Sequence, residues 1–401
     1  MTLANGRPYL AIPGPSTLPD RVLAAMHRAA PNIYGGALYD MVETLWPDLR
    51  TLAGTTANVA AYIGNGHAMW EAANANLFAR GDKALVIATG NFGQGWAQSA
   101  RAMGVGVEML DFGKSAPADM GLVAETLRAD KSHAIKAVLT THVDTASSVK
   151  TDIPALRAAL DAAGHPALLA VDCIASLGCD VYHMDAWGVD VTVAASQKGL
   201  MTPPGMGFVW FSEAARARCK ETDLRSPYWD WTPRADASEF WQYWAGTAPT
   251  HHLFGLREAL TMILHEEGLA AVWARHEALA RAVWAAFEAW GAGNPAIALN
   301  VADAADRGRS VTAARLGAPH ATRLRDWTET KAGVTLGIGL GMAAPSDPAY
   351  HGYLRLAHMG HVNAHMTLGA LAVMEAGMIA LGIAHGPGAL RAAAAVVGGA
   401  A

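Results

Sequence analysis

One lysine of this chain has clear chemical potential. Lys198 follows the apolar stretch Val189–Ala194 and precedes a turn rich in proline and glycine, residues 199–207. Burying an ammonium group is costly, so a buried lysine usually has a lowered pKa or loses its charge in a covalent bond. A Schiff base with a carbonyl compound is such a bond, and lysine is the residue that forms it. The apolar flanks and the rigid turn therefore favour a reactive amine over a surface lysine.

An aspartate lies 26 residues before this lysine. Asp172 ends a second strand-like segment, Ala167–Val171. A carboxylate and an amine at two strand ends are the protein groups that pyridoxal phosphate (PLP) needs. The carboxylate keeps the ring nitrogen protonated, and the released lysine amine moves a proton between the substrate Cα and the cofactor C4′. The alternative for Asp172 is a cap on the turn that follows it.

Three further motifs follow strand-like segments. Residues 64–68 (Gly-Asn-Gly-His-Ala) come after a strand and open a helix, which suits a phosphate, although many tight turns have this form. Phe92 lies in a glycine-rich loop and would stack on a flat ring, or be an ordinary core residue. Thr145 belongs to a cluster of hydroxyl residues, 142–148, that suits a cofactor oxygen or a substrate carboxylate but also plain turn chemistry.

A late arginine is the candidate for the substrate's carboxylate. Arg355 stands inside the apolar segment 353–360. A buried guanidinium is costly unless it meets an anion, and its planar fork fits a carboxylate with two hydrogen bonds. The alternative is an internal ion pair with a carboxylate of the protein.

The elements that must position these residues are visible in the hydrophobic pattern. Between residues 55 and 212, strand-like runs alternate with four helical patterns, Met69–Ala79, Gln94–Met103, Leu122–Ala129 and Ile153–Ala163. The predicted strands are Val59–Ile63, Ala84–Ala88, Ala137–Thr141, Ala167–Val171, Val189–Ala194 and Gly207–Phe211. Such a pattern predicts an α/β fold with a mostly parallel central sheet sandwiched by helices. Ligands of these sheets bind at the carboxyl ends of the strands, where Asp172 and Lys198 fall.

The pattern changes after residue 250. Two long helical stretches, His251–Gly268 and Leu269–Trp290, lead into a smaller α+β region. This region contains the strand-like segments Gly333–Gly341 and Leu354–Met359 and a helix near residues 366–383. We expect a large domain with an N-terminal arm over residues 1–265 and a small C-terminal domain over residues 266–401.

Composition excludes several classes of protein. The 401 residues are 52% hydrophobic and 16% charged, with a net charge of −5 and no basic run, which argues against nucleic-acid binding. The apolar stretch 366–384 contains Glu375 and several glycines, so a core helix is expected rather than a membrane span. Three cysteines without a CxxC pair and an N-terminus without an apolar signal core favour a reducing cytoplasm, and no metal site is expected.

Taken together, these residues resemble the class V aminotransferases of PLP fold type I, in the alanine–glyoxylate and serine–glyoxylate group. The likeness runs from Pro13–Ser16 to about Gly382. Its most specific parts are residues 171–178, residues 196–205 and the late Arg355. The resemblance implies a homodimer with an active site shared between the subunits.

The resemblance also implies a role for each residue at the site. Lys198 would be the Schiff-base lysine and Asp172 the partner of the ring nitrogen. The remaining cofactor contacts would be Asn65, Gly66, His67 and Gln197 at the phosphate, Phe92 and Ile174 on the ring faces, Thr145 near the cofactor oxygen, and Trp244 and Thr247 at the neighbouring subunit's phosphate. The substrate would be bound by Arg355, with Tyr34 and Gly14 beside it.

Some segments depart from the pattern of the family. Trp244 stands where the family has a tyrosine, and residues 31–36 lack the His-Arg pattern of serine–glyoxylate members. The loop 343–352 is longer than expected. The stretch 354–360 is also similar to pyridoxamine–pyruvate aminotransferase, a relative in the same group. The identity of the amino donor is therefore open.

The predicted activity is that of a PLP-dependent aminotransferase with a ping-pong mechanism through pyridoxamine phosphate. One convincing carboxylate-binding arginine favours a small neutral donor such as serine or alanine, with glyoxylate or pyruvate as the 2-oxo acid acceptor. The rivals are a pyridoxamine–pyruvate aminotransferase, a PLP-dependent lyase such as a cysteine desulfurase, and a non-catalytic protein of the same fold. A desulfurase needs a reactive cysteine in a late loop, whereas all three cysteines precede residue 220.

Overall fold

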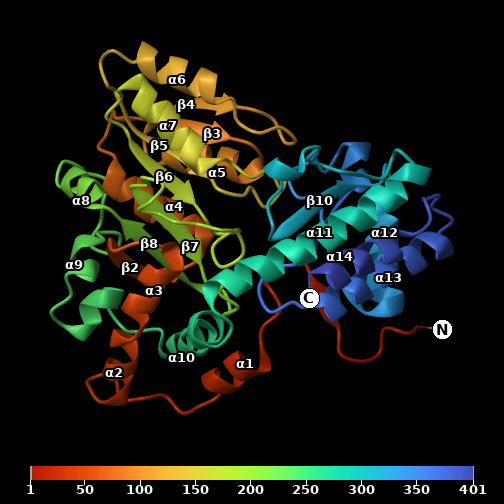
Figure 1. Ribbon diagram of the computed structural model, residues 1–401. Coiled ribbons are helices and arrows are strands. Elements are labelled where there is room, and N and C mark those ends of the chain that lie inside the picture. Colours follow the sequence, from red (N-terminus) through yellow and green to blue (C-terminus); the bar gives the residue numbers. More distant parts are fainter. Residues whose placement is uncertain (1, 401) are drawn as a thin grey trace.

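The computed structural model describes residues 2–400 and contains two sheets with helices around them (Figure 1). The larger sheet has seven strands in the order β2-β8-β7-β6-β5-β3-β4. These are β2 (Asn58–Gly64), β3 (Lys83–Ala88), β4 (Gly106–Asp111), β5 (Ile135–Thr141), β6 (Leu168–Asp172), β7 (Val191–Ala195) and β8 (Gly205–Phe211). Only β8 runs against its neighbours, so the predicted mostly parallel α/β sheet is confirmed.

Both faces of this sheet are buried. Along β5, Val138 packs into one hydrophobic cluster, whereas Ala137 and Leu139 pack into the other. This alternation requires apolar residues at every position, which explains the continuous apolar runs of the sequence. The helices of this part are α3 (Leu45–Ala53), α4 (Gly66–Leu77), α5 (Asn91–Ala102), α6 (Met120–Ala129), α7 (Ile153–Ala163) and α8 (Glu213–Cys219).

One strand of the larger sheet, β4, was not predicted from the sequence. The edge strand β4 is only partly buried and alternates between exposed and half-buried residues. Its sequence carries Glu108 and Asp111 on a solvated edge, so it lacks the apolar run that identified the central strands. The six predicted strands are present, with ends that differ by at most two residues.

The smaller sheet is built from both ends of the chain. Its order is β1-β11-β12-β10-β9, with β1 (Tyr9–Ala11), β9 (Ala298–Leu299), β10 (Val311–Arg315), β11 (Val334–Ile338) and β12 (Tyr353–Ala357). The N-terminal β1 pairs in parallel with β11, although the sequence carries no recognisable signal for a strand of three residues. The segment before residue 12 thus joins the small sheet, and the division near residue 265 stays a proposal.

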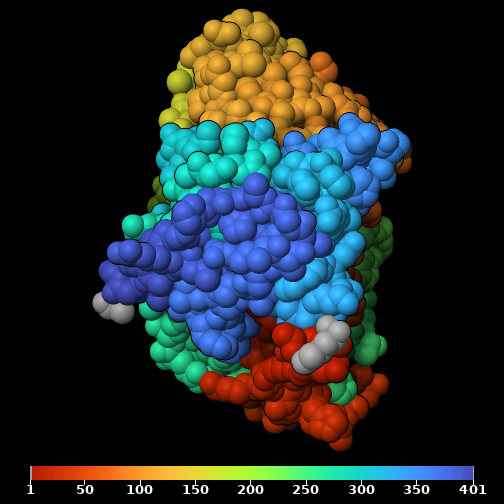
Figure 2. All heavy atoms as spheres, turned by 90° about the vertical axis from the view of Figure 1, so that its right-hand side faces the viewer, coloured from red at the N-terminus to blue at the C-terminus, as the bar shows by residue number. Residues whose placement is uncertain are grey.

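The remaining helices cover the small sheet and join the two parts. They are α1 (Asp20–Met26), α2 (Ala37–Glu43), α9 (Thr232–Ala235), α10 (Thr250–Leu260), α11 (Leu269–Gly293), α12 (His320–Ala332), α13 (Ala364–Ala380) and α14 (Ala389–Gly399). Short 3-10 segments, Phe240–Trp244 (η1), Ala304–Asp306 and Pro348–Gly352, and a π-helical stretch, Thr261–Glu267, complete the chain. In Figure 1 the long α11 extends from the larger sheet to the C-terminal helices. In Figure 2 the blue C-terminal third fills the middle of one face, above the red N-terminal residues.

The apolar stretch predicted as a core helix is α13. Its interior face packs into the cluster of the small sheet, and Glu375 accepts a hydrogen bond of 2.9 Å from the Trp290 indole. Within residues 2–400, none of the helices combines the length and apolar character needed to cross a membrane.

Candidate active site

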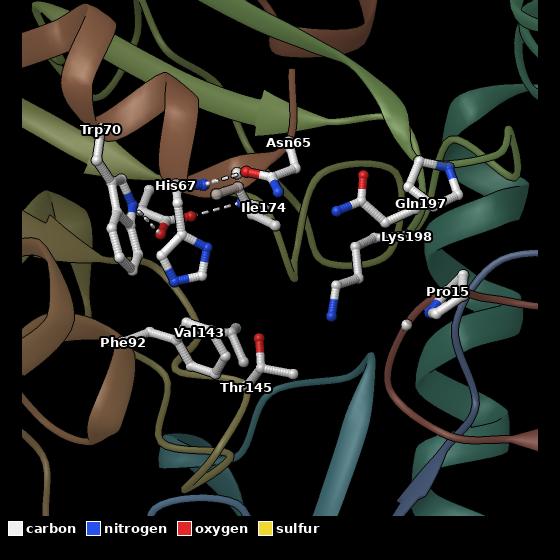
Figure 3. Close-up of a pocket in the computed structure, with 14 residues that line it drawn as sticks. Pro15, Asn65, His67, Trp70, Phe92, Val143, Thr145, Ile174, Gln197 and Lys198 are labelled. Carbon is white, nitrogen blue, oxygen red and sulfur yellow. Dashed lines mark hydrogen bonds between the residues drawn. The ribbon is translucent and has the colours of Figure 1, made fainter. Parts of the chain in front are cut away.

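A cavity of about 220 Å³ opens at the carboxyl ends of β6 and β7 (Figure 3). Ten of the predicted site residues line it: Gly14, Asn65, Gly66, His67, Phe92, Thr145, Asp172, Ile174, Gln197 and Lys198. Trp70, Val143, Pro15 and Pro204 complete the lining. The lining residues come from six separate segments of the chain, and five of these segments follow strands of the larger sheet, as its topology requires.

Lys198 extends into this cavity with only 9% of its surface exposed (Figure 3). Its Nζ donates a hydrogen bond to the carbonyl oxygen of Pro13. Burial lowers the pKa of Lys198 to about 8, and the positive charge of Arg355 acts in the same direction. About a tenth of this amine is therefore neutral at pH 7, far more than for an ordinary lysine, and the neutral form is the one that a nucleophile or a general base requires.

Asp172 is the last residue of β6 and is 4% exposed. Its Oδ1 accepts a hydrogen bond of 2.7 Å from the Ile174 amide, and its Oδ2 accepts one of 2.8 Å from the Trp70 indole. Burial raises the pKa of Asp172 to about 7, while these two hydrogen bonds lower it. The carboxylate thus does cap the following turn, and it also faces the cavity.

Trp70 is the site residue that sequence reasoning missed. It lies on α4, three residues after His67, and its ring packs 4.6 Å from the His67 ring. Residues three apart lie on the same face of a helix, so the position of His67 in the predicted phosphate motif could have indicated that Trp70 also faces the cavity. Its indole N–H is the side-chain donor that holds Asp172.

Asp144 joins the loop that carries Thr145 to the first turn of α5, which carries Phe92, so Phe92 lies in a helix and not in the predicted loop. Its carboxylate accepts hydrogen bonds from the amides of Phe92 (2.7 Å), Gly93 (3.1 Å) and Ala146 (2.9 Å). A Cβ atom at Gly90 would lie 2.5 Å from this carboxylate, so glycine is needed there. The sequence identified the loop as turn chemistry but gave no sign of this long-range partner.

The glycine turn at the start of α4 forms the upper wall of the cavity. Asn65 caps the helix, since its Oδ1 accepts hydrogen bonds from the amides of His67 (3.1 Å) and Ala68 (3.3 Å). A Cβ at Gly66 would lie 2.5 Å from Ile174 Cδ1, so the turn and Ile174 meet only because residue 66 is glycine. Opposite, Gln197 has a buried side-chain oxygen without a hydrogen-bond partner within residues 2–400.

Arg355 lies on β12 beside the cavity and is 6% exposed. Its Nε donates to the Ile338 carbonyl (2.7 Å) and its Nη1 to the Thr145 carbonyl (3.0 Å). Among the described residues 2–400, no carboxylate oxygen lies within 4.0 Å of its guanidinium, so the alternative of an internal ion pair is wrong. Burial lowers the pKa of Arg355 to about 10, while the charge of Asp144 raises it. A buried cation without an anion is a site for an anionic ligand.

Besides Arg355, three predicted residues do not line the cavity. Tyr34 is 86% exposed, and Thr247 is exposed as well. Trp244 is 1% exposed and packs against Trp46 with ring centroids 6.1 Å apart. Its indole nitrogen is buried and has no hydrogen-bond partner within residues 2–400, so it would have to turn outward to reach another subunit. The roles expected for these residues stay predictions.

Comparison with known proteins identifies the family of this chain. Residues 9–346 match the family described as Aminotransferase class-V. The chain belongs to the class-V aminotransferase family. It is 35% identical to a serine–glyoxylate aminotransferase of Methylorubrum extorquens, over 98% of this chain and 96% of the relative. It is also 35% identical to an L-aspartate–glyoxylate aminotransferase of Paracoccus denitrificans, over 93% and 91% of the two chains.

A solved structure extends the comparison to the fold. The pyridoxamine–pyruvate aminotransferase of Mesorhizobium loti superposes with a TM-score of 0.87, at 25% identity and 100% coverage of both chains. The expected class V membership, PLP fold type I and aminotransferase activity are thereby confirmed. As a class-V aminotransferase the chain is expected to bind PLP, and the cavity fits it. It offers a buried amine, a buried carboxylate, an apolar slot between Phe92 and Ile174, and a glycine turn at a helix N-terminus.

Proposed function

We propose that this enzyme transfers an amino group from a small amino acid, with serine or alanine as the expected donors, to a 2-oxo acid such as glyoxylate or pyruvate. One observation carries the proposal. A buried amine of lowered pKa and a buried carboxylate share one cavity, and beside it lies a buried arginine that has no carboxylate partner within the described part of the chain, residues 2–400. These groups match the three charged parts of the reaction: the amino group in transfer, the cofactor ring and the carboxylate of the acid.

The lining residues divide the tasks of holding PLP. Asp172 would hold the ring nitrogen, Phe92 and Ile174 would cover the ring faces, and Thr145 would meet the ring oxygen. The phosphate would be bound by Asn65, Gly66, His67 and Gln197 at the N-terminus of α4, where the positive end of the helix dipole favours an anion. Bound PLP supplies the carbonyl carbon and the ring that takes up the electron pair from the substrate.

The protein's own residues bind the acid and move its proton. Arg355 would hold the carboxylate of the donor and later that of the acceptor. The neutral amine of Lys198 would then accept the proton from the substrate Cα and return it, first as base and then as acid. Gly14 lies against this amine, because a Cβ there would be 2.5 Å from Lys198 Nζ. Together with Tyr34, Gly14 is proposed to border the substrate.

The shape of the cavity favours a donor with a small neutral side chain. Its volume is about 220 Å³, and apart from Lys198 no lysine or arginine lines it among residues 2–400, so Arg355 beside it is the single proposed partner for a carboxylate. The name of the Methylorubrum relative agrees with serine as donor and glyoxylate as acceptor. Because the Paracoccus relative acts on aspartate, aspartate is the second candidate donor.

The active form is proposed to be a homodimer in which each subunit completes the other's site. Large apolar side chains are exposed on two elements that pack together: Trp241 (58%) on η1 and Ile63 (43%) on β2. Such clustering of apolar surface is typical of an interface. Thr247, exposed next to η1, and Trp244 after reorientation would then contact the partner's phosphate. A cytoplasmic location is part of the proposal, since all three cysteines are free and buried.

The burial of the cysteines argues against a PLP-dependent lyase of the cysteine desulfurase type. Burial raises the pKa of Cys179 to about 12 and that of Cys173 well above its usual range, so neither is a reactive thiolate. A pyridoxamine–pyruvate activity is the alternative that has a specific observation behind it, the superposition with the Mesorhizobium enzyme.

A half-reaction screen tests the proposal. The PLP-loaded protein is mixed separately with serine, alanine, aspartate and unphosphorylated pyridoxamine, and the products are identified. Formation of bound pyridoxamine phosphate and a 2-oxo acid from serine or alanine is expected. Release of a leaving group without pyridoxamine phosphate would indicate a lyase. Lys198→Ala should still bind PLP but lose turnover, and full activity of this variant would contradict the assigned role.

A further inference from the structure

The N-terminal segment Pro13–Ser16 crosses from the small sheet to Lys198. It follows directly on β1, which pairs with β11 of the small sheet. At its other end, the Ser16 amide donates a hydrogen bond of 2.9 Å to the Gln197 carbonyl. The Ser16 hydroxyl donates one of 2.7 Å to the carbonyl oxygen of Lys198 itself. Ser16 is 3% exposed, so both hydrogen bonds are shielded from water.

The same segment holds the lysine's amine. Nζ of Lys198 donates its hydrogen bond to the Pro13 carbonyl, three residues before Ser16. The lysine is thus held at its backbone by one end of the segment and at its amine by the other. Gly360 packs against both residues, because a Cβ there would lie 3.2 Å from the Lys198 carbonyl oxygen and 3.3 Å from Ser16 Oγ.

The segment also touches the strand that opposes Arg355. Gly337 on β11 is the register partner of Arg355 on β12. A Cβ at Gly337 would lie 2.7 Å from Pro13 Cδ and 3.2 Å from the Arg355 Cβ, so Pro13 and Arg355 pack on the same glycine. A short series of contacts therefore runs from the arginine through Gly337 and Pro13 to the amine of Lys198.

We propose that Ser16 is a positioning residue for the reaction, which fixes Lys198 on the Pro13–Ser16 segment and so sets its amine relative to Arg355. The inference rests on the proposed roles of these two residues. The α-amino and α-carboxylate groups of an amino acid are separated by a single carbon atom, so the groups that act on them must be held at a fixed separation. Misplacement of a reacting group by a fraction of an ångström is costly in rate.

Ser16→Ala removes the hydroxyl and leaves the backbone hydrogen bond to Gln197. Ser16→Cys keeps a weak donor of similar size. Thr17→Ala is the matched control, since among the described residues 2–400 the Thr17 hydroxyl donates to the Leu10 carbonyl (3.3 Å) and not to the lysine loop. The first measurement is the rate at which PLP becomes attached to Lys198, trapped by borohydride reduction and located by peptide mass. In this attachment the lysine Nζ bonds to the aldehyde carbon and water leaves.

The expected order of attachment rates is wild type, then Ser16→Cys, then Ser16→Ala, with Ser16→Ala slower by about two- to tenfold, the weight of one buried hydrogen bond. The kcat should fall by a similar factor, while the KM for the amino donor stays within about twofold because Arg355 is untouched. Thr17→Ala should match the wild type. If Ser16→Ala does not fold, Ser16→Cys alone supplies the comparison.

Two results would overturn the inference: an attachment rate and kcat equal to wild type in both Ser16 variants, or an equal loss in Thr17→Ala. A loss confined to thermal stability, with attachment and kcat unchanged below the melting temperature, would assign Ser16 a structural role only. If wild-type protein attaches no PLP at Lys198, the proposed function itself is wrong.

Discussion

The hydrogen bond from Trp70 to Asp172 gives a sharp prediction about cofactor binding. Trp70→Phe removes the indole N–H that lies 2.8 Å from Asp172 Oδ2 but keeps an aromatic ring at that position. A hydrogen bond to a charged group is worth about 1.5–3 kcal/mol, and one pKa unit corresponds to about 1.4 kcal/mol. The pKa of Asp172, about 7 in the PLP-free chain, should therefore rise by about one to two units.

The consequence is a shift in the pH dependence of PLP affinity. An aspartate is ionised above its pKa, so a raised pKa moves the ionised form to higher pH. At pH 7 the ionised fraction of Asp172 should fall from about one half to about a tenth or less, which weakens PLP binding about five- to fiftyfold. Above both pKa values the affinities of variant and wild type should converge.

The measurement is the dissociation constant of PLP between pH 5 and about pH 10, the range that brackets these pKa values. Trp96→Phe is the matched control, because Trp96 is stacked on Trp70 with ring centroids 6.2 Å apart. The indole of Trp96 donates to Asn74 Oδ1 (3.0 Å) and not to Asp172. The assignment of this hydrogen bond would be refuted if the weakening of PLP binding at low pH set in at the same pH in Trp70→Phe as in the wild type. It would also be refuted if Trp96→Phe moved that pH by the same amount.

Two further predictions concern the buried cations. Arg355→Ala should raise the KM for the amino donor by about ten- to a hundredfold, the worth of charge-assisted hydrogen bonds, and leave the PLP dissociation constant unchanged; steady-state kinetics with an unaltered KM would contradict this. Lys198→Met should stabilise the PLP-free protein, because the folded chain lowers the pKa of Lys198 from 10.5 to about 8 and so resists its protonation. This loss of stability is complete below pH 8, the pKa of Lys198 in the folded chain, and disappears above 10.5, its pKa in the unfolded chain. The free energy of unfolding of Lys198→Met, measured with urea, should therefore exceed that of the wild type by about 3 kcal/mol near pH 7, and the difference should shrink as the pH rises to 10.5. A gain independent of pH would show that the cause is packing, not charge.

The sequence predicted the parts of the site that the topology alone brings together. Lys198 and Asp172 end adjacent parallel strands, so no detail of side-chain packing was needed to predict that they meet. The glycine turn at Asn65 and the loop with Thr145 follow the same rule. Arg355 was found because a cation inside an apolar strand is unusual wherever the strand lies.

The contacts that the sequence did not reveal depend on rotamers and on distant pairings. Trp70 and Asp144 reach their partners across 102 and 52 residues of sequence, and neither has a local signature. The short β1 has no periodicity from which its pairing with β11 could be predicted. The burial of Trp244 depends on its packing against Trp46, which the comparison with a family tyrosine could not indicate.

The physical character of this site lies in buried charges that the protein leaves without ionic partners. Within residues 2–400, Asp172, Lys198 and Arg355 are all at least 91% buried, and none of them forms a salt bridge. Each therefore has its pKa moved toward the neutral form, which is a cost to the folded protein. Ligand groups of opposite charge relieve that cost: a protonated ring nitrogen beside Asp172 and a carboxylate beside Arg355. Binding and folding stability are then two sides of one free energy, so each ligand should raise the melting temperature of the protein. The variant that lacks the corresponding charge should lose that increase.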